Sequence, residues 1–87
     1  MYQLLFSPLS KKDAKKLSAA GLDIKAKALL DIIQQNPYAY PPPFEFLKGN
    51  LKGFISRKIN RQHRLVYRVL EEKKIVKIVR MWTHYGE

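Results

Sequence analysis

Three segments in the C-terminal half of the chain have the composition of β-strands and are separated by very short polar breaks. The segments are rich in Val, Ile, Tyr and Phe, and they cover residues 54–59, 64–70 and 73–82. The breaks, at residues 60–62 and 71–72, are long enough for little more than a turn. The sequence therefore predicts two consecutive β-hairpins, and a fold for this chain has to contain a mainly antiparallel sheet.

The segment at residues 64–70 alternates cleanly between apolar and polar positions. Leu65, Tyr67 and Val69 lie on one face of the predicted strand, whereas Arg64, Val66 and Arg68 lie on the other. We expect the apolar face to cover the core and the face with the two arginines to stay open.

The N-terminal half predicts one strand and two helices. The apolar residues 2–6 predict a strand with neighbours on both sides. Ser10, with Asp13 three residues later, resembles the start of a first helix, and Gly21 has the position of a helix-ending glycine. Apolar residues recur at helical spacing through residues 22–35, which predicts a second helix. The proline-rich segment after it, residues 37–44, predicts a loop.

The resulting order is β, α, α, β, β, β, which predicts an α+β fold with both helices packed on one face of the sheet. With 87 residues, the chain is long enough for one domain, residues 1–87. No apolar run approaches the roughly 20 residues of a membrane span, and the N-terminus lacks the features of a secretory signal. There is also no cysteine. We therefore expect a cytoplasmic protein with no membrane partner.

Charge indicates the class of partner. Lys and Arg number 17 and Asp and Glu number 7, which gives a net charge of +10. Residues 44–87 carry eleven of these cations against four Glu, so the C-terminal half is the expected contact surface. Nucleic acid is the first candidate, because cations bind phosphates with release of counterions. An anionic membrane or an acidic protein is the alternative.

The residues that could perform chemistry are few. The sequence has no glycine-rich phosphate loop, no cysteine nucleophile, no closely spaced pair of histidines and no cluster of carboxylates, so we expect neither a metal nor a cofactor. RNA can be cut without a metal, because its 2′-hydroxyl can attack the adjacent phosphate. That reaction needs a base, an acid and fixed cations. Glu45, His84 and Arg64 are residues of these types.

Glu45 precedes a long run of cations and should therefore be ionised at neutral pH, ready to act as a base. Structural explanations stay open beside this one. Glu45 could form a surface ion pair, Arg64 could position a phosphate without catalysing a reaction, and His84 lies near a terminus that could fray. Tyr38, Tyr40 and Phe44 could stack on RNA bases or pack on the proline run.

The segment FEFLKGNLKGFISRKINRQHRLVYRV and the ending HYGE resemble the YoeB/Txe branch of the RelE/ParE toxin superfamily. The matching positions are Glu45, Leu47, Lys48, Leu51, Gly53, Ser56, Arg57, Lys58, Ile59, Gln62, His63, Arg64, Leu65, Val66, Tyr67, His84 and Tyr85. The chain departs from the family pattern in having Gly86 and Glu87 after the terminal His-Tyr, and in having Thr83 where some members carry an aromatic residue.

This resemblance implies a RelE-like microbial RNase fold and a metal-independent, ribosome-dependent mRNA endonuclease that inhibits translation. It implies Glu45 as the base, Arg64 as the transition-state cation, His84 as the acid and Tyr85 as the residue that stacks on or orients a base. The expected RNA- or ribosome-binding cations are Lys48, Lys52, Arg57, Lys58, Arg61 and Arg68.

The resemblance also implies partners. They are an acidic antitoxin of the YefM/Phd type and the 70S ribosome with its mRNA. Operator DNA is expected to be bound only by the toxin–antitoxin complex, and a homodimer is left open. Two other functions remain open, a non-catalytic nucleic-acid or ribosome-binding module and a ParE-like toxin that poisons DNA gyrase. Neither of them requires a base and an acid.

Overall fold

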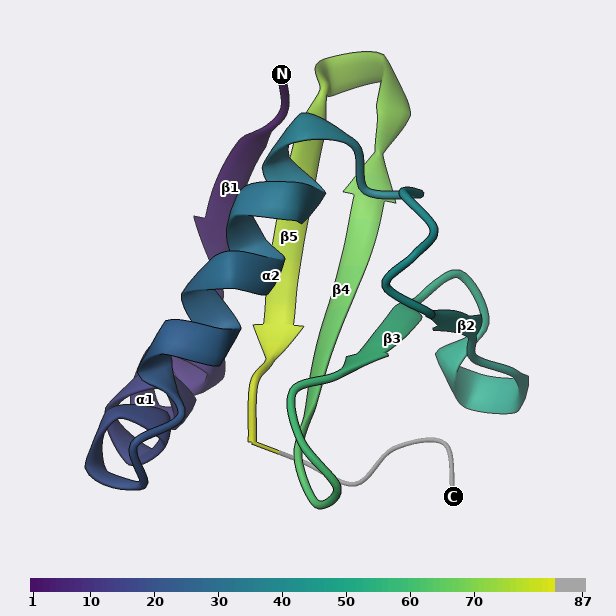
Figure 1. Cartoon of the computed structure of the whole chain (residues 1–87). Coiled ribbons are helices and arrows are strands. Elements are labelled where there is room, and N and C mark those ends of the chain that lie inside the picture. The colour runs from purple at the N-terminus through teal and green to yellow at the C-terminus, as the bar shows by residue number, and fades with distance from the viewer. Residues whose placement is uncertain (83–87) are drawn as a thin grey trace.

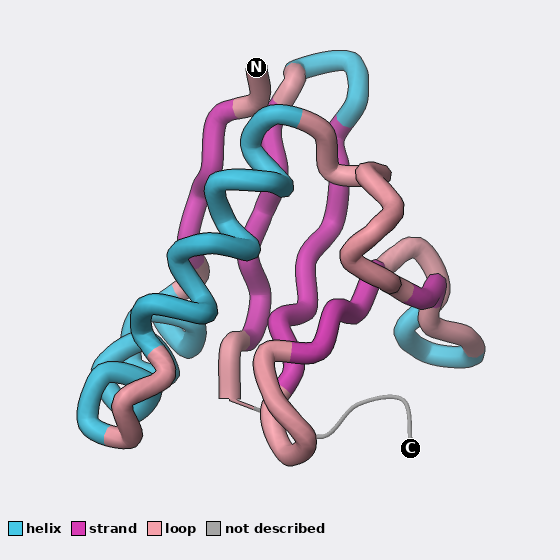
Figure 2. The backbone as a smooth tube through the Cα atoms, viewed as in Figure 1, coloured by secondary structure: helices cyan, strands magenta, loops and turns pink. Residues whose placement is uncertain are grey.

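The computed structural model describes residues 1–82 and has two helices and a five-stranded sheet (Figures 1 and 2). The elements, in chain order, are β1 (Gln3–Phe6), α1 (Pro8–Ala19), α2 (Asp23–Gln35), β2 (Glu45–Phe46), β3 (Ile55–Lys58), β4 (Arg64–Leu70) and β5 (Ile75–Arg80), with short 3-10 helices η1 (Gly49–Leu51) and η2 (Glu71–Lys73). This confirms the α+β prediction, and β4 has the predicted bounds.

The strand order is β1-β5-β4-β3-β2. The pairs β2–β3, β3–β4 and β4–β5 are antiparallel, as the two hairpins predict, whereas β1 is parallel to β5. The expectation that β1 has neighbours on both sides is wrong, because β1 is an edge strand that pairs with β5 alone. The two-residue strand β2, which forms the other edge, was not predicted, since so short a segment has no period to detect.

The first helix begins earlier than the sequence analysis predicts. Ser7, not Ser10, is the N-cap, and its side chain accepts a hydrogen bond from the backbone N–H of Ser10 over 3.0 Å. Pro8 follows at a position where a missing N–H costs nothing. Ser10 is buried within the helix, and its hydroxyl donates to the carbonyl of Ser7 over 2.8 Å. The Ser-Pro pair was the better signal for the helix start.

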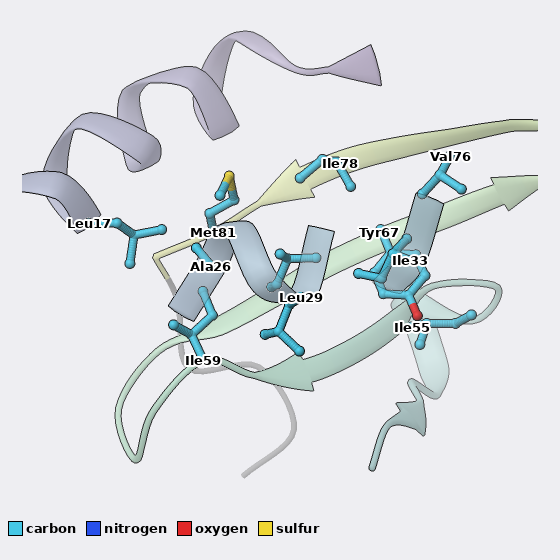
Figure 3. Packing of buried hydrophobic residues seen from close by; sticks show 11 residues of the cluster. Leu17, Ala26, Leu29, Ile33, Ile55, Ile59, Tyr67, Val76, Ile78 and Met81 are labelled. Atoms are coloured by element: carbon cyan, nitrogen blue, oxygen red, sulfur yellow. The ribbon is translucent and has the colours of Figure 1, made fainter. Parts of the chain in front are cut away.

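The helices cover one face of the sheet and enclose the core (Figures 1 and 3). Ala26, Leu29 and Ile33 form the buried stripe of α2, at the spacing that predicts a helix. They pack with Tyr67, Ile78 and further apolar side chains of β3, β4 and β5. Between α1 and α2, Gly21 has φ +74°, a conformation that favours glycine. None of the helices within residues 1–82 has the length and apolar character that a bilayer crossing requires.

Candidate active site

A pocket of about 260 Å³ lies on the sheet where β2, β3 and β4 adjoin the proline-rich segment. Its lining residues are Pro42, Pro43, Phe44, Glu45, Ser56, Lys58 and Arg64. Strand pairing brings them together, because Glu45 is the partner of Ser56, and Lys58 is the partner of Arg64. Cross-strand partners direct their side chains to the same face of a sheet, so the four polar residues share one wall of the pocket.

Glu45 and Arg64 form an ion pair at this pocket. Nη1 of Arg64 lies 3.4 Å from Oε1 of Glu45. The Arg64 side chain is 15% exposed and the Glu45 side chain is 50% exposed. A close charge-assisted hydrogen bond is about 2.7–2.9 Å long, so this pair is loose. The surface ion pair that the sequence analysis left open is therefore present, and it joins the two residues that the proposed chemistry needs side by side.

The predicted cations divide into those at the pocket and those away from it. Lys58 lines the pocket beside Arg64. Arg68 is exposed on the same face of β4 and lies over the Phe54 ring, 5.8 Å from its centroid. Lys48 and Lys52 are exposed on either side of η1.

Arg61 lies elsewhere. It is in the loop between β3 and β4, where it lines a separate hollow with Lys25 of α2. The expected contact surface is thus continuous in sequence but divided in space.

The prediction for Arg57 is wrong. Its side chain is buried, with only 1% of the residue exposed, on the face of β3 opposite to the pocket. The guanidinium donates to the Tyr67 hydroxyl over 2.9 Å and to three carbonyls of the proline-rich segment, those of Pro37, Ala39 and Pro42. Four of its five N–H donors are therefore engaged inside the protein, and the buried guanidinium is not accessible to a phosphate.

The alternation of β3 contains a signal for this burial. Ile55 and Arg57 lie on one face of the strand, while Ser56 and Lys58 lie on the other. The same alternation would have selected Ser56, which the sequence analysis did not consider as a functional residue.

An aromatic row runs beside the pocket. The ring of Phe44 lies edge-to-face with Tyr40, at 5.8 Å, and with Phe46, at 5.4 Å. Tyr40 and Phe46 are exposed. Phe46 had not been singled out from the sequence. The row supplies apolar surface close to Glu45, on which a base could stack.

The two histidines have different outcomes. His63 is buried and stacks on Trp82 with ring centroids 3.7 Å apart. Trp82 packs against the core and Met81 is part of it. His84 and Tyr85 lie outside the described residues, so their predicted roles remain predictions.

The end of β5 is bound to α1 by an ion pair that the sequence did not reveal. Nε of Arg80 lies 2.8 Å from Oδ2 of Asp13, which also accepts the backbone N–H of Met81 over 2.9 Å. Burial raises the pKa of the Asp13 carboxyl, but the hydrogen bonds from Arg80 and Met81 and the charges of Arg80 and Lys16 outweigh burial, so the net pKa is lowered. This pair holds the chain in place immediately before the residues predicted to supply the acid.

The pocket combines a carboxylate, two cations and a nearby aromatic surface. Within residues 1–82, no three His, Cys, Asp or Glu side chains lie together in a way that could hold a metal ion. The chemistry that the pocket residues themselves can supply is proton removal by Glu45 and stabilisation of negative charge by Arg64 and Lys58.

Comparison with known proteins identifies the family. Residues 11–85 match the YoeB-like toxin of bacterial type II toxin-antitoxin systems. Toxin YoeB from Synechocystis is 38% identical over 64 residues, which is 74% of this chain and 67% of that protein.

Solved structures agree. A YoeB/ParE toxin from Agrobacterium tumefaciens has a TM-score of 0.86 at 28% identity, with 95% of this chain and 99% of that chain covered. The toxin in a YoeB-YefM complex from Staphylococcus aureus has a TM-score of 0.80 at 34% identity, with 98% and 99% covered. These likenesses confirm the RelE/YoeB-like fold, and the chain belongs to the YoeB-like toxins of bacterial type II toxin-antitoxin systems.

Proposed function

We propose that this toxin is a ribosome-dependent mRNA endonuclease that cuts in the ribosomal A site and thereby inhibits translation. The 2′-hydroxyl of the RNA attacks the adjacent phosphorus, so a P–O2′ bond forms and the P–O5′ bond breaks. The products are a 2′,3′-cyclic phosphate and a 5′-hydroxyl. The observation that carries this proposal is the loose Glu45–Arg64 pair at the mouth of a small pocket that also holds Lys58.

Each residue has a distinct role in this reaction. Glu45 accepts the proton of the 2′-hydroxyl, and its half-exposed carboxylate is accessible to RNA. Arg64 and Lys58 stabilise the additional negative charge on the phosphorane. His84 protonates the leaving 5′-oxygen, and Tyr85 orients the base; these two roles rest on the family resemblance alone.

The looseness of the Glu45–Arg64 pair favours catalysis over a purely structural ion pair. A phosphate bound between them would take over the donors of Arg64 and leave the carboxylate for the 2′-hydroxyl. A close, bidentate pair would have to be broken before the phosphate could bind, at a cost in binding free energy.

We further propose that an acidic antitoxin segment binds the basic face and blocks the pocket. The net charge of +10 favours an acidic partner, and the related toxin from Staphylococcus aureus was solved in complex with YefM. A segment that folds as it binds could cover both the pocket and the exposed Arg68 of β4.

The test uses mRNA on translating ribosomes, with a 2′-deoxy sugar placed immediately 5′ to the cut site found with unmodified mRNA. The parental protein is expected to cut the unmodified mRNA, leaving a 5′-hydroxyl, and to leave the 2′-deoxy mRNA intact. Efficient cleavage of the 2′-deoxy mRNA with a 5′-phosphate product would overturn the mechanism. No cleavage of any mRNA, together with inhibition of DNA gyrase, would replace the proposal with the ParE-like alternative.

A further inference from the structure

We propose that the hydroxyl of Ser56 contacts the substrate, donating a hydrogen bond to a non-bridging oxygen of the phosphate that is cut. This inference rests on the proposed function and adds a fourth group to Glu45, Arg64 and Lys58. Ser56 shares the stabilisation of negative charge with Arg64 and Lys58, while Glu45 is the base.

The hydroxyl of Ser56 is buried without a hydrogen-bond partner among residues 1–82. Only 1% of the residue is exposed. A buried hydroxyl without a partner costs free energy, so a protein keeps one where another role compensates. Ala at this position would fill nearly the same space without that cost.

Ser10 shows what a structural buried serine does in this chain. It is as deeply buried as Ser56, but its hydroxyl donates to the carbonyl of Ser7 over 2.8 Å. The two serines therefore have similar burial and opposite hydrogen-bond states.

The position of Ser56 indicates its ligand. Ser56 lies between Glu45 and Val66 in the row of residues that pair across β2, β3 and β4, and it lines the pocket with Glu45, Lys58 and Arg64. A group that binds between two cations is an anion, and in RNA that group is the phosphate. A serine hydroxyl has one O–H donor, and a phosphate oxygen can accept that hydrogen bond. We infer that a bound phosphate satisfies the Ser56 hydroxyl.

The contact is also suited to the transition state. As the phosphorane forms, negative charge grows on the non-bridging oxygens, so a donor in fixed position becomes stronger at that moment. Ser56 is on a strand within the sheet rather than on a loop, so its hydroxyl needs little reorganisation.

The experiment compares Ser56→Ala with Ser10→Ala, with three measurements on each full-length variant. These are thermal unfolding, single-turnover cleavage of mRNA on ribosomes, and affinity for ribosomes carrying the 2′-deoxy mRNA. Ser56→Ala is expected to keep or raise the unfolding temperature and to slow cleavage by about 10²- to 10³-fold, the range for losing one donor to a developing oxyanion. Ser10→Ala is expected to lower the unfolding temperature and leave cleavage by the folded protein unchanged.

The possible outcomes separate this inference from the proposed function. If the parental protein cuts mRNA and Ser56→Ala cuts it equally fast with unchanged affinity, the inference is overturned and the proposed function stands. A fall in unfolding temperature equal to that of Ser10→Ala would also overturn it, because the hydroxyl would then have an internal partner. If the parental protein cuts no mRNA, the proposed function fails, and weaker binding of the 2′-deoxy complex by Ser56→Ala would still support the contact, whereas equal binding would refute it.

Discussion

Nε of Arg57 donates a hydrogen bond to the hydroxyl of Tyr67 over 2.9 Å, and that hydroxyl donates in turn to the carbonyl of Pro37 over 2.6 Å. The two side chains thus join β3 and β4 to the segment that follows α2. Arg57 also binds the carbonyl of Pro42, which lines the pocket, and lies 4.8 Å from the centroid of the Phe44 ring. A buried cation on the core side therefore positions one wall of the site on the opposite side of the sheet.

Arg57→Lys is expected to lower the free energy of unfolding by about 2–4 kcal/mol, because a lysine keeps the charge but cannot reproduce the planar set of donors that reaches four partners. Urea denaturation followed by circular dichroism measures the change. Arg61→Lys is the matched control in an exposed loop, where a change within about 0.5 kcal/mol is expected. Equal stability of the two variants would mean that the hydrogen bonds from the Arg57 guanidinium to the carbonyls do not stabilise the fold.

Asp13→Asn tests the attachment of β5 to α1. The pKa of Asp13 is lowered in the folded protein, so its contribution to stability is present above the unfolded value of 3.8 and is lost as pH falls through the folded pKa. We expect Asp13→Asn to be less stable than the parental protein by about 1–3 kcal/mol at pH 7. That difference should shrink as the pH falls below about 3.8, in urea titrations from pH 7 to pH 2.

The control for this variant is Asp31→Asn. Asp31 forms an exposed pair with Lys27 on α2, at 3.4 Å, and its loss is expected to change stability little at any pH. A stability difference for Asp13→Asn that stayed constant down to pH 2 would show that the carboxylate charge is not what binds Arg80.

Glu45→Gln is expected to slow single-turnover cleavage by about 10²- to 10⁴-fold, the usual loss when one general base is removed. Affinity for the ribosome should change little, because the amide keeps the size of the side chain. A rate equal to that of the parental protein would leave Glu45 with its ion pair to Arg64 and no catalytic role.

Lys52→Ala should have the reverse effect. Lys52 is exposed next to η1 and does not line the pocket, so we expect weaker ribosome binding with an unchanged rate in the bound state. The slope of log affinity against log salt should become shallower by about one phosphate contact. An unchanged slope over a series of salt concentrations would exclude a phosphate contact at this residue.

The elements that local pattern determines were predictable from the sequence. Apolar residues recur at helical spacing in α2 and at alternate positions in β4. This periodicity indicates which face of each element is buried. The hairpins followed from breaks too short for any other connection. The start of α1 was missed by three residues, because Ser7 and Ser10 both have the chemistry of an N-cap.

The site was only partly accessible from the sequence. Glu45, Lys58 and Arg64 were selected by residue type and family resemblance, and the structure brings all three to one pocket. Their proximity comes from strand pairing, since β2 is too short to be recognised and lies next to β3 only once the sheet has formed.

The alternation of β3 separates Arg57 from Ser56, but only the tertiary structure decided their hydrogen-bond states. A buried guanidinium is stable only when hydrogen-bond acceptors surround it, and the three carbonyls that bind Arg57 come from residues 15 to 20 positions earlier in the chain. From the sequence, Arg57 is one more cation in a basic run. Whether a buried polar group has a hydrogen-bond partner depends on atoms that are distant in sequence and come together on folding. The sequence therefore determined which polar side chains the protein has, and the fold determined which of them are left to bind a ligand.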